Sequence, residues 1–157
     1  MALTRRVARP FLAAPFVLGG IETLRNPAPK VAQAADVAPK GAGPLGLPQD
    51  TEKLVKINSV VQIVGGLLLA CGRFRRLTAL ALAGSLVPTT LAGHAFWKVT
   101  DPAAQSRQKI QFSKNLGLLG GLILELVDTE GAPSLGWRAK RAARKAKERI
   151  EEVLPGD

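Results

Sequence analysis

Five polar side chains lie in or beside long apolar segments, and their types could do chemistry at a shared site. A carboxylate can orient one nitrogen of an imidazole and favour the protonated ring, which leaves the other nitrogen to donate to a ligand carbonyl. If these segments span a membrane, an ionisable residue within them is by default a candidate functional residue. The candidate ligand-binding residues are Glu22, Asn58, Gln62, His94 and Asn115.

The segments that carry these residues are long enough to cross a membrane. Residues 77–97 carry no formal charge when the histidine is neutral, and alone they meet the roughly 20 residues that a spanning helix needs. The other segments reach or approach this length by borrowing flanking residues, whose charged ends can extend to the headgroups. The predicted spans cover about 7–24, 54–72, 77–97 and 112–127.

Two alternatives to four spans remain open. Helices of a soluble four-helix bundle need a polar stripe facing water, and residues 63–71 and 116–124 contain no polar side chain that could form one. Residues 1–24 also have the basic start and apolar stretch of a cleaved signal peptide, although Glu22 lies where a small-residue cleavage site would be. The sequence therefore favours an all-α, four-helix transmembrane bundle.

Chain direction places the five candidate residues in one half of the membrane. Glu22 and His94 come near the ends of the first and third spans, and the other three come near the starts of the second and fourth. All four spans thus contribute to one polar cluster, in which Glu22 and His94 form the natural pair. The cluster is either a ligand site, which the loop 26–49 could cover, or a set of structural groups that reach water and join helices.

Local signals predict where the helices begin and end. Asp50 is a suitable N-cap for the second span, and Asp101 followed by proline starts the fourth helix outside the membrane. Gly72 ends the second helix before a tight basic turn. The proline-rich loop between the first two spans has room for one short helix over 30–37.

Small residues at helical spacing predict close helix packing in every span. Such residues let membrane helices approach each other, and they do not identify the partner helix. The pairs are Gly19–Gly20, Gly66 with Ala70, Ala79 with Ala83, and Gly117 with Gly121.

The charge distribution predicts the orientation. The chain has 22 Lys and Arg against 12 Asp and Glu, for a formal net charge of +10. With four spans, both termini lie on the same side as the turn 73–76, and this side carries more Lys and Arg near the span ends. We expect both termini in the cytoplasm.

Residues 132–157 form a tail distinct from the membrane domain 1–131. Apolar residues recur at helical spacing over 137–154, between faces that are first basic and then acidic. This pattern predicts an amphipathic cytoplasmic helix that binds anionic lipid, with Trp137 as an interfacial anchor. A solvated tail is the alternative. Nucleic-acid binding is disfavoured because no aromatic residue interrupts the basic run.

The composition restricts the available chemistry. One cysteine, Cys71, excludes a disulfide framework, a cysteine-ligated zinc site and an iron–sulfur cluster. A single histidine excludes a bis-histidine haem within one protomer. No nucleophile–base arrangement, phosphate loop or metal-ligand spacing is present. We therefore expect no metal, no covalently bound cofactor and no catalysis by this chain alone.

Several short segments, taken in order, resemble the DoxX family of small four-span bacterial membrane proteins. The resemblance covers about 7–131, and the chain resembles actinobacterial members with a long first loop and a basic tail. The acidic position of the family's first span matches Glu22, and its third-span histidine matches His94. The segments are Arg9–Pro10, Phe16–Leu24, Val64–Phe74, Pro88–Trp97 and Lys114–Gly121.

The resemblance implies a multi-pass protein of the bacterial inner membrane. Relatives are associated with thiosulfate:quinone oxidoreduction and membrane redox complexes, usually as non-catalytic subunits. It therefore implies a subunit or anchor of a membrane redox assembly, with other membrane subunits as partners and a quinone as ligand. A stand-alone small-molecule binder or transporter, and a purely structural accessory subunit, are the alternatives.

Overall fold

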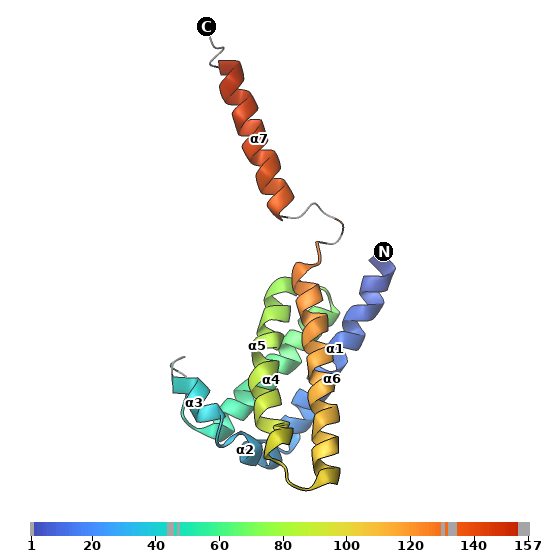
Figure 1. Cartoon of the computed structure of the whole chain (residues 1–157), viewed down its shortest axis with the longest axis vertical. Coiled ribbons are helices and arrows are strands. Elements are labelled where there is room, and N and C mark those ends of the chain that lie inside the picture. The colour runs from blue at the N-terminus through green and yellow to red at the C-terminus, as the bar shows by residue number, and fades with distance from the viewer. Residues whose placement is uncertain (1, 44–45, 47, 130, 132–134, 154–157) are drawn as a thin grey trace. The chain divides into compact units, whose positions relative to one another are not determined.

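The computed structural model describes residues 2–43, 46, 48–129, 131 and 135–153, and the regular structure in these ranges is helical throughout. Four helices are long and apolar enough to cross a membrane: α1 (Ala2–Arg25), α4 (Thr51–Ala70), α5 (Arg75–Gly93) and α6 (Pro102–Val127). Figure 1 shows them side by side as a bundle. The prediction of an all-α, four-helix transmembrane bundle is confirmed. The chain divides into two compact units, Met1–Val127 and Asp128–Asp157.

The predicted start and stop signals act at both ends of α4 and at the start of α6. The Asp50 carboxylate accepts hydrogen bonds from the backbone N–H groups of Glu52 at 2.9 Å and Lys53 at 3.3 Å. Asp101 accepts from the N–H of Ala104 at 2.6 Å. Gly72 adopts φ 69°, and the N–H groups of residues 72 and 73 bond back to the carbonyls of 69 and 68, both at 2.9 Å. This pair of bonds is a Schellman motif, which ends α4 where the sequence predicts.

The third predicted span, 77–97, is interrupted in the structure. Helix α5 ends at Gly93, His94 leaves helical geometry with φ −135°, and a short 3₁₀ helix, η2, covers Phe96–Lys98. A Cβ on Gly93 would lie 3.3 Å from the Gln33 side chain, so the loop approaches α5 closely at this point. The break turns the chain toward α6 and takes His94 out of the helix.

The long first loop contains two short helices where the sequence suggested one over 30–37. They are α2 (Ala28–Ala34) and α3 (Ala38–Ala42), and each has a proline in its first turn. Proline favours the start of a helix because it lacks the N–H that the first turn leaves unpaired. Both helices pack against α4 and α5 (Figure 1).

The bundle has a small core and apolar outer faces. Lipid-facing apolar side chains such as Phe11 and Leu124 are 76% and 70% exposed. The helices approach most closely at glycines: a Cβ on Gly66 would lie 2.7 Å from Val17, and a Cβ on Gly121 would lie 2.9 Å from Leu12. The buried cluster comprises Ala13, Phe16, Leu69, Ala79, Leu82, Leu86 and Leu122.

The second unit contains helix α7 (Leu135–Val153). Its Arg141 guanidinium lies 5.0 Å from the centre of the Trp137 ring, within range of a cation–π contact. Arg144 and Glu148 form an ion pair at 3.7 Å on consecutive turns. The predicted helical tail is present, and Leu154 lies outside the described residues.

Candidate functional site

Four of the five candidate residues lie toward the end of the bundle that carries the long loop, and Gln62 lies near the middle of α4. The last turns of α1 and α5 and the first turns of α4 and α6 meet there, opposite the N-terminus and the α4–α5 turn (Figure 1). We call this the loop end, and the opposite one the turn end. The predicted gathering of four helix ends follows from the alternating chain direction.

Two amides of α4 bond to hydroxyls of α5. Asn58 donates from Nδ2 to the Thr89 hydroxyl at 3.1 Å, and Gln62 donates from Nε2 to the Ser85 hydroxyl at 3.0 Å. Gln62 and Ser85 are both buried. The two bonds lie one helical turn apart and join α4 to α5.

A third amide connects α6 to α5 in the same way. Asn115 donates from Nδ2 to the Thr90 hydroxyl at 2.9 Å. The hydroxyls of Thr89 and Thr90 in turn donate to the backbone carbonyls of Ser85 at 2.8 Å and Leu86 at 2.7 Å. These carbonyls lie next to that of Gly84, which has no backbone donor because Pro88 lacks an N–H. The amides therefore connect helices and at the same time support a proline-containing turn.

His94 bonds to a residue that the sequence did not single out. Its Nδ1 lies 2.7 Å from Oε1 of Gln108 on α6. In the tautomer that carries its proton on Nδ1, the ring donates to this amide oxygen, and Nε2 of the neutral ring is left as an acceptor. Helical periodicity could have identified Gln108, because it shares one face of α6 with Phe112 and Asn115.

Glu22 does not take part in this network. Its side chain is exposed, and among the described residues no hydrogen bond or ion pair joins it to His94. The structure thus brings Asn58, Gln62 and Asn115 to the flanks of α5 and places His94 at its end. The role of the five residues in ligand binding stays a prediction.

An aromatic cluster lies next to His94. The rings of Phe96, Trp97 and Phe112 meet edge to face, with centroid distances of 5.1, 5.5 and 5.9 Å. Lys109 places Nζ 5.7 Å from the centre of the Phe96 ring. The Trp97 side chain is 53% exposed. The loop end therefore combines one imidazole with an accessible aromatic surface.

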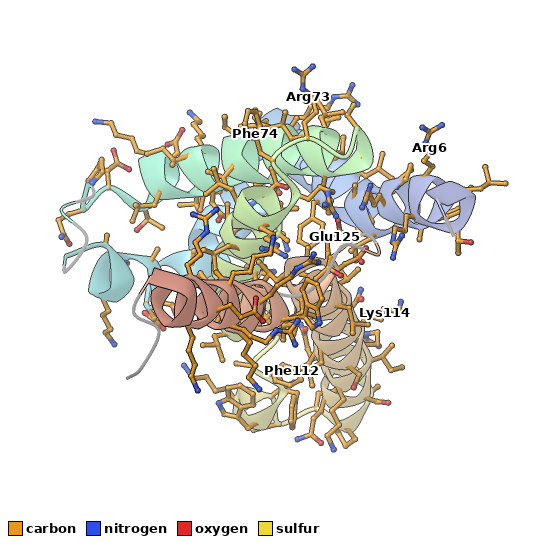
Figure 2. The ribbon with its side chains drawn as sticks, turned by 90° about the horizontal axis from the view of Figure 1, so that it is seen from above. Arg6, Arg73, Phe74, Phe112, Lys114 and Glu125 are labelled. Carbon is orange, nitrogen blue, oxygen red and sulfur yellow. The ribbon has the colours of Figure 1, made fainter. Side chains whose placement is uncertain are left out.

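A second polar cluster lies at the turn end, where the sequence placed only terminal charges. Arg9 of α1 donates from Nε to Oε1 of Glu125 on α6 at 3.0 Å, and Arg75 places Nη1 3.6 Å from the same oxygen. Arg9 and Glu125 are each 8% exposed. Figure 2 shows Glu125 inside the bundle, whereas Arg6 and Arg73 lie at its outer edge. We call Arg9, Glu125 and Arg75 the ionic triad.

The sequence signal for this triad was that Arg9 and Glu125 lie at equal depth in two antiparallel spans. Arg9 lies two residues inside the start of the first predicted span, 7–24, and Glu125 lies two residues inside the end of the fourth, 112–127, so each is about half a turn from its span end. Opposite charges that lie slightly inside the same end of a bundle can pair with each other and need not extend to water. For metals, no group of three or more His, Cys, Asp or Glu side chains in the described ranges could hold an ion.

Comparison with known proteins gives one match. The family model described as DoxX matches residues 5–95, from α1 to the end of α5. No curated protein and no solved structure matches the chain. The matched region contains four of the five candidate residues, and Asn115 lies beyond it.

Proposed function

Because the chain belongs to the DoxX family, we propose that this multi-pass membrane protein is a subunit or anchor of a membrane redox assembly and contacts a quinone. The observation that carries the proposal is the His94 imidazole, held by Gln108 beside the aromatic cluster at the loop end. The proposed location is the bacterial inner membrane, with both termini in the cytoplasm. The excess of Lys and Arg on the turn-end side supports this orientation.

The residues at the loop end suit a quinone head group. With Nδ1 donating to Gln108, Nε2 of His94 can accept a proton from a quinol hydroxyl, or donate to a carbonyl when the ring is protonated. The exposed indole of Trp97 offers a flat apolar surface on which a ring can stack. A bound quinone would supply two-electron redox chemistry. The chain would orient the head group and exchange a proton at Nε2 of His94.

A non-catalytic role fits the remaining polar side chains. Asn58, Gln62 and Asn115 each donate to a hydroxyl of α5, and these bonds join neighbouring helices. Interhelical bonds of this kind stabilise a fixed arrangement of membrane helices. A rigid bundle with one ligand-facing imidazole suits a subunit that positions a quinone for a partner.

The same bonds favour a second candidate, a purely structural accessory subunit. In that case the polar side chains would hold α4, α5 and α6 together and no ligand would bind at the loop end. The two candidates differ in one measurable property, which is quinone contact at His94.

Photoaffinity labelling with an azidoquinone tests the proposal on the full chain in nanodiscs. We expect label in the peptide that spans 94–112, and Gln108→Ala should reduce labelling about fivefold, the effect of losing ~1 kcal/mol of hydrogen bonding. Gln111→Ala is the matched control, because Gln111 is an exposed glutamine on the same helix. Label confined to other regions, or equal loss in both variants, would favour the structural subunit.

Double substitution shows whether His94 and Gln108 act together. If Gln108 works through the imidazole, His94→Ala should lower labelling as much as the double variant His94→Ala/Gln108→Ala does. Residues that act as a unit are non-additive in this way. Independent, additive losses would separate Gln108 from the histidine.

A further inference from the structure

We propose that the α4–α5 turn binds anionic phospholipid headgroups and anchors this end of the bundle at the membrane surface. The binding residues are Arg73, Phe74 and Arg76, which we call the anchor turn. This role is independent of the proposed quinone contact, which belongs to the opposite end of the bundle.

The backbone of the anchor turn separates inward-pointing from outward-pointing side chains. Phe74 adopts φ 49° and ψ 35°, a left-handed conformation that bulky residues rarely adopt. After it, the Arg75 side chain lies against Glu125 of the ionic triad. Arg73 and Arg76 are exposed, and Phe74 is 69% exposed. Backbone strain of this kind is concentrated at functional positions.

The anchor turn lies at the level of the headgroups if the candidate spans cross a membrane. It connects the span that ends at Ala70 with the span that begins at Arg75. Leu77 and Leu80, one and two turns after Phe74 on α5, are 67% and 60% exposed. Phe74 therefore begins an apolar, lipid-facing stripe, and its ring would sit at the boundary between headgroups and acyl chains.

The chemistry of the turn selects an anionic lipid. Guanidinium groups bind phosphate oxygens with two parallel hydrogen bonds, and Arg73 and Arg76 present two such groups beside one apolar ring. Phosphatidylglycerol brings a phosphate with no ammonium group to neutralise it, unlike phosphatidylcholine. The continuity of Phe74 with Leu77 and Leu80 favours a lipid over an acidic protein, because the same stripe continues into the acyl-chain region.

The single cysteine provides a reporter on the turn itself. Cys71 is exposed and precedes Phe74 by three residues, so a fluorophore on its thiol reads the lipids around the turn. The full chain is placed in liposomes containing brominated phosphatidylglycerol or brominated phosphatidylcholine. We expect stronger quenching by the anionic lipid. The ratio of the two association constants should fall about fivefold for Arg73→Gln and about fivefold for Arg76→Gln, since each guanidinium would lose a direct hydrogen bond to phosphate of ~1 kcal/mol.

Arg6→Gln is the matched control, because Arg6 is an exposed arginine on α1 at the same end, away from the turn in Figure 2. It should leave the ratio within about twofold of the original, as expected for a charge outside the binding contacts. An equal fall in Arg6→Gln would reduce the effect to a general surface potential and overturn the site. Equal quenching of the original protein by both lipids would also overturn it.

Two further arms test the aromatic ring and the source of the phosphate. Phe74→Gly removes the ring and relieves the left-handed strain, so the variant should fold while both brominated lipids quench the fluorophore less. Unchanged quenching would remove Phe74 from the anchor. Inorganic phosphate at constant ionic strength should not displace the anionic lipid. Displacement would assign the arginines to a free anion and overturn the lipid proposal.

Discussion

Glu125 joins α1, α5 and α6 through its carboxylate, so its charge matters for the stability of the bundle. Its Oε1 lies 3.0 Å from Nε of Arg9 and 3.6 Å from Nη1 of Arg75, and both Arg9 and Glu125 are buried. Glu125→Gln would leave the two guanidinium groups close together without this carboxylate. We expect a loss of about 3 kcal/mol in unfolding free energy, measured by denaturant titration in mild detergent.

The control for Glu125→Gln is the same substitution at Glu52, which forms an exposed ion pair with Lys56. That change should cost no more than ~0.5 kcal/mol. The triple variant Arg9→Met/Arg75→Met/Glu125→Leu should recover much of the lost stability, because apolar groups of similar volume can replace all three charges of the ionic triad. If Glu52→Gln and Glu125→Gln cost the same, the triad is not a buried ionic cluster.

At this scale the sequence predicted positions along the helix axis but not directions around it. Counting from span ends gives depth, because depth follows from chain direction: Asn58 and Asn115 bond to hydroxyls in the last turns of α5, and Gln62 bonds deeper, near its middle. Which side chains meet depends on the rotation of each helix. That rotation brings Gln108 within hydrogen-bond distance of the His94 ring and leaves Glu22 exposed.

Neighbouring glycines in α1 offer a direct test of how α1 and α4 pack. A Cβ on Gly20 would lie 2.9 Å from the backbone carbonyl oxygen of Ser59 and 2.7 Å from Ile63, whereas a Cβ on Gly19 would meet nothing within 4 Å. Gly20→Ala should cost about 1–3 kcal/mol because the Ser59 backbone cannot move without disturbing α4. Gly19→Ala should stabilise the helix by up to ~1 kcal/mol.

Thermal unfolding of both variants in the same detergent measures the difference. The opposite signs make each variant the control for the other. Equal stabilisation by both substitutions would show that α1 does not approach α4 closely at Gly20.

Helix ends were predictable where a side chain or a glycine specifies them. The N-cap bonds of Asp50 and Asp101 start α4 and α6, and the backbone bonds at Gly72 end α4, as these residue types suggest. The break at His94 was not predictable, since the apolar stretch continues to Trp97 without a charge. The small-residue motifs were likewise predictable only in part. Gly121 packs on Leu12 as expected, whereas a Cβ on Gly117 would meet nothing within 4 Å.

At the scale of the whole molecule, we expect that the tail can be removed without disturbing the bundle. Helix α7 belongs to a separate compact unit. Deletion of 137–157 should leave the unfolding midpoint of the bundle unchanged and lower the amount of anionic lipid that co-purifies. Each Lys or Arg near the surface contributes ~1 kcal/mol of attraction. Lipid mass spectrometry of the full and shortened chains gives the comparison.

The tail prediction fails if the peptide 137–157 remains unstructured on anionic vesicles, as judged by circular dichroism. The basic residues would then form a solvated tail. A variant with Arg141, Arg144 and Lys145 changed to Gln has the same length as the full chain. A loss of co-purifying anionic lipid in this variant would therefore come from the lost charge and not from the lost helix.

Reporter fusions test the orientation of the four spans. Reporters that are active only in the cytoplasm should be active after Asp157 and within 73–76, and inactive within 30–45. The physical reason is the larger number of Lys and Arg near the span ends on the turn-end side. The reverse pattern would invert the orientation, and with it the proposed cytoplasmic position of the anchor turn.

Purification of the full-length protein in mild detergent tests the central claim, membership of a membrane redox assembly. We expect a stoichiometric complex with at least one other membrane subunit that transfers electrons to or from a quinone analogue. His94→Gln should lower that transfer while leaving the complex intact, because His94 lies at the loop end and contacts Gln108 of the same chain. A protein that migrates alone and binds a small molecule without a partner would contradict the account.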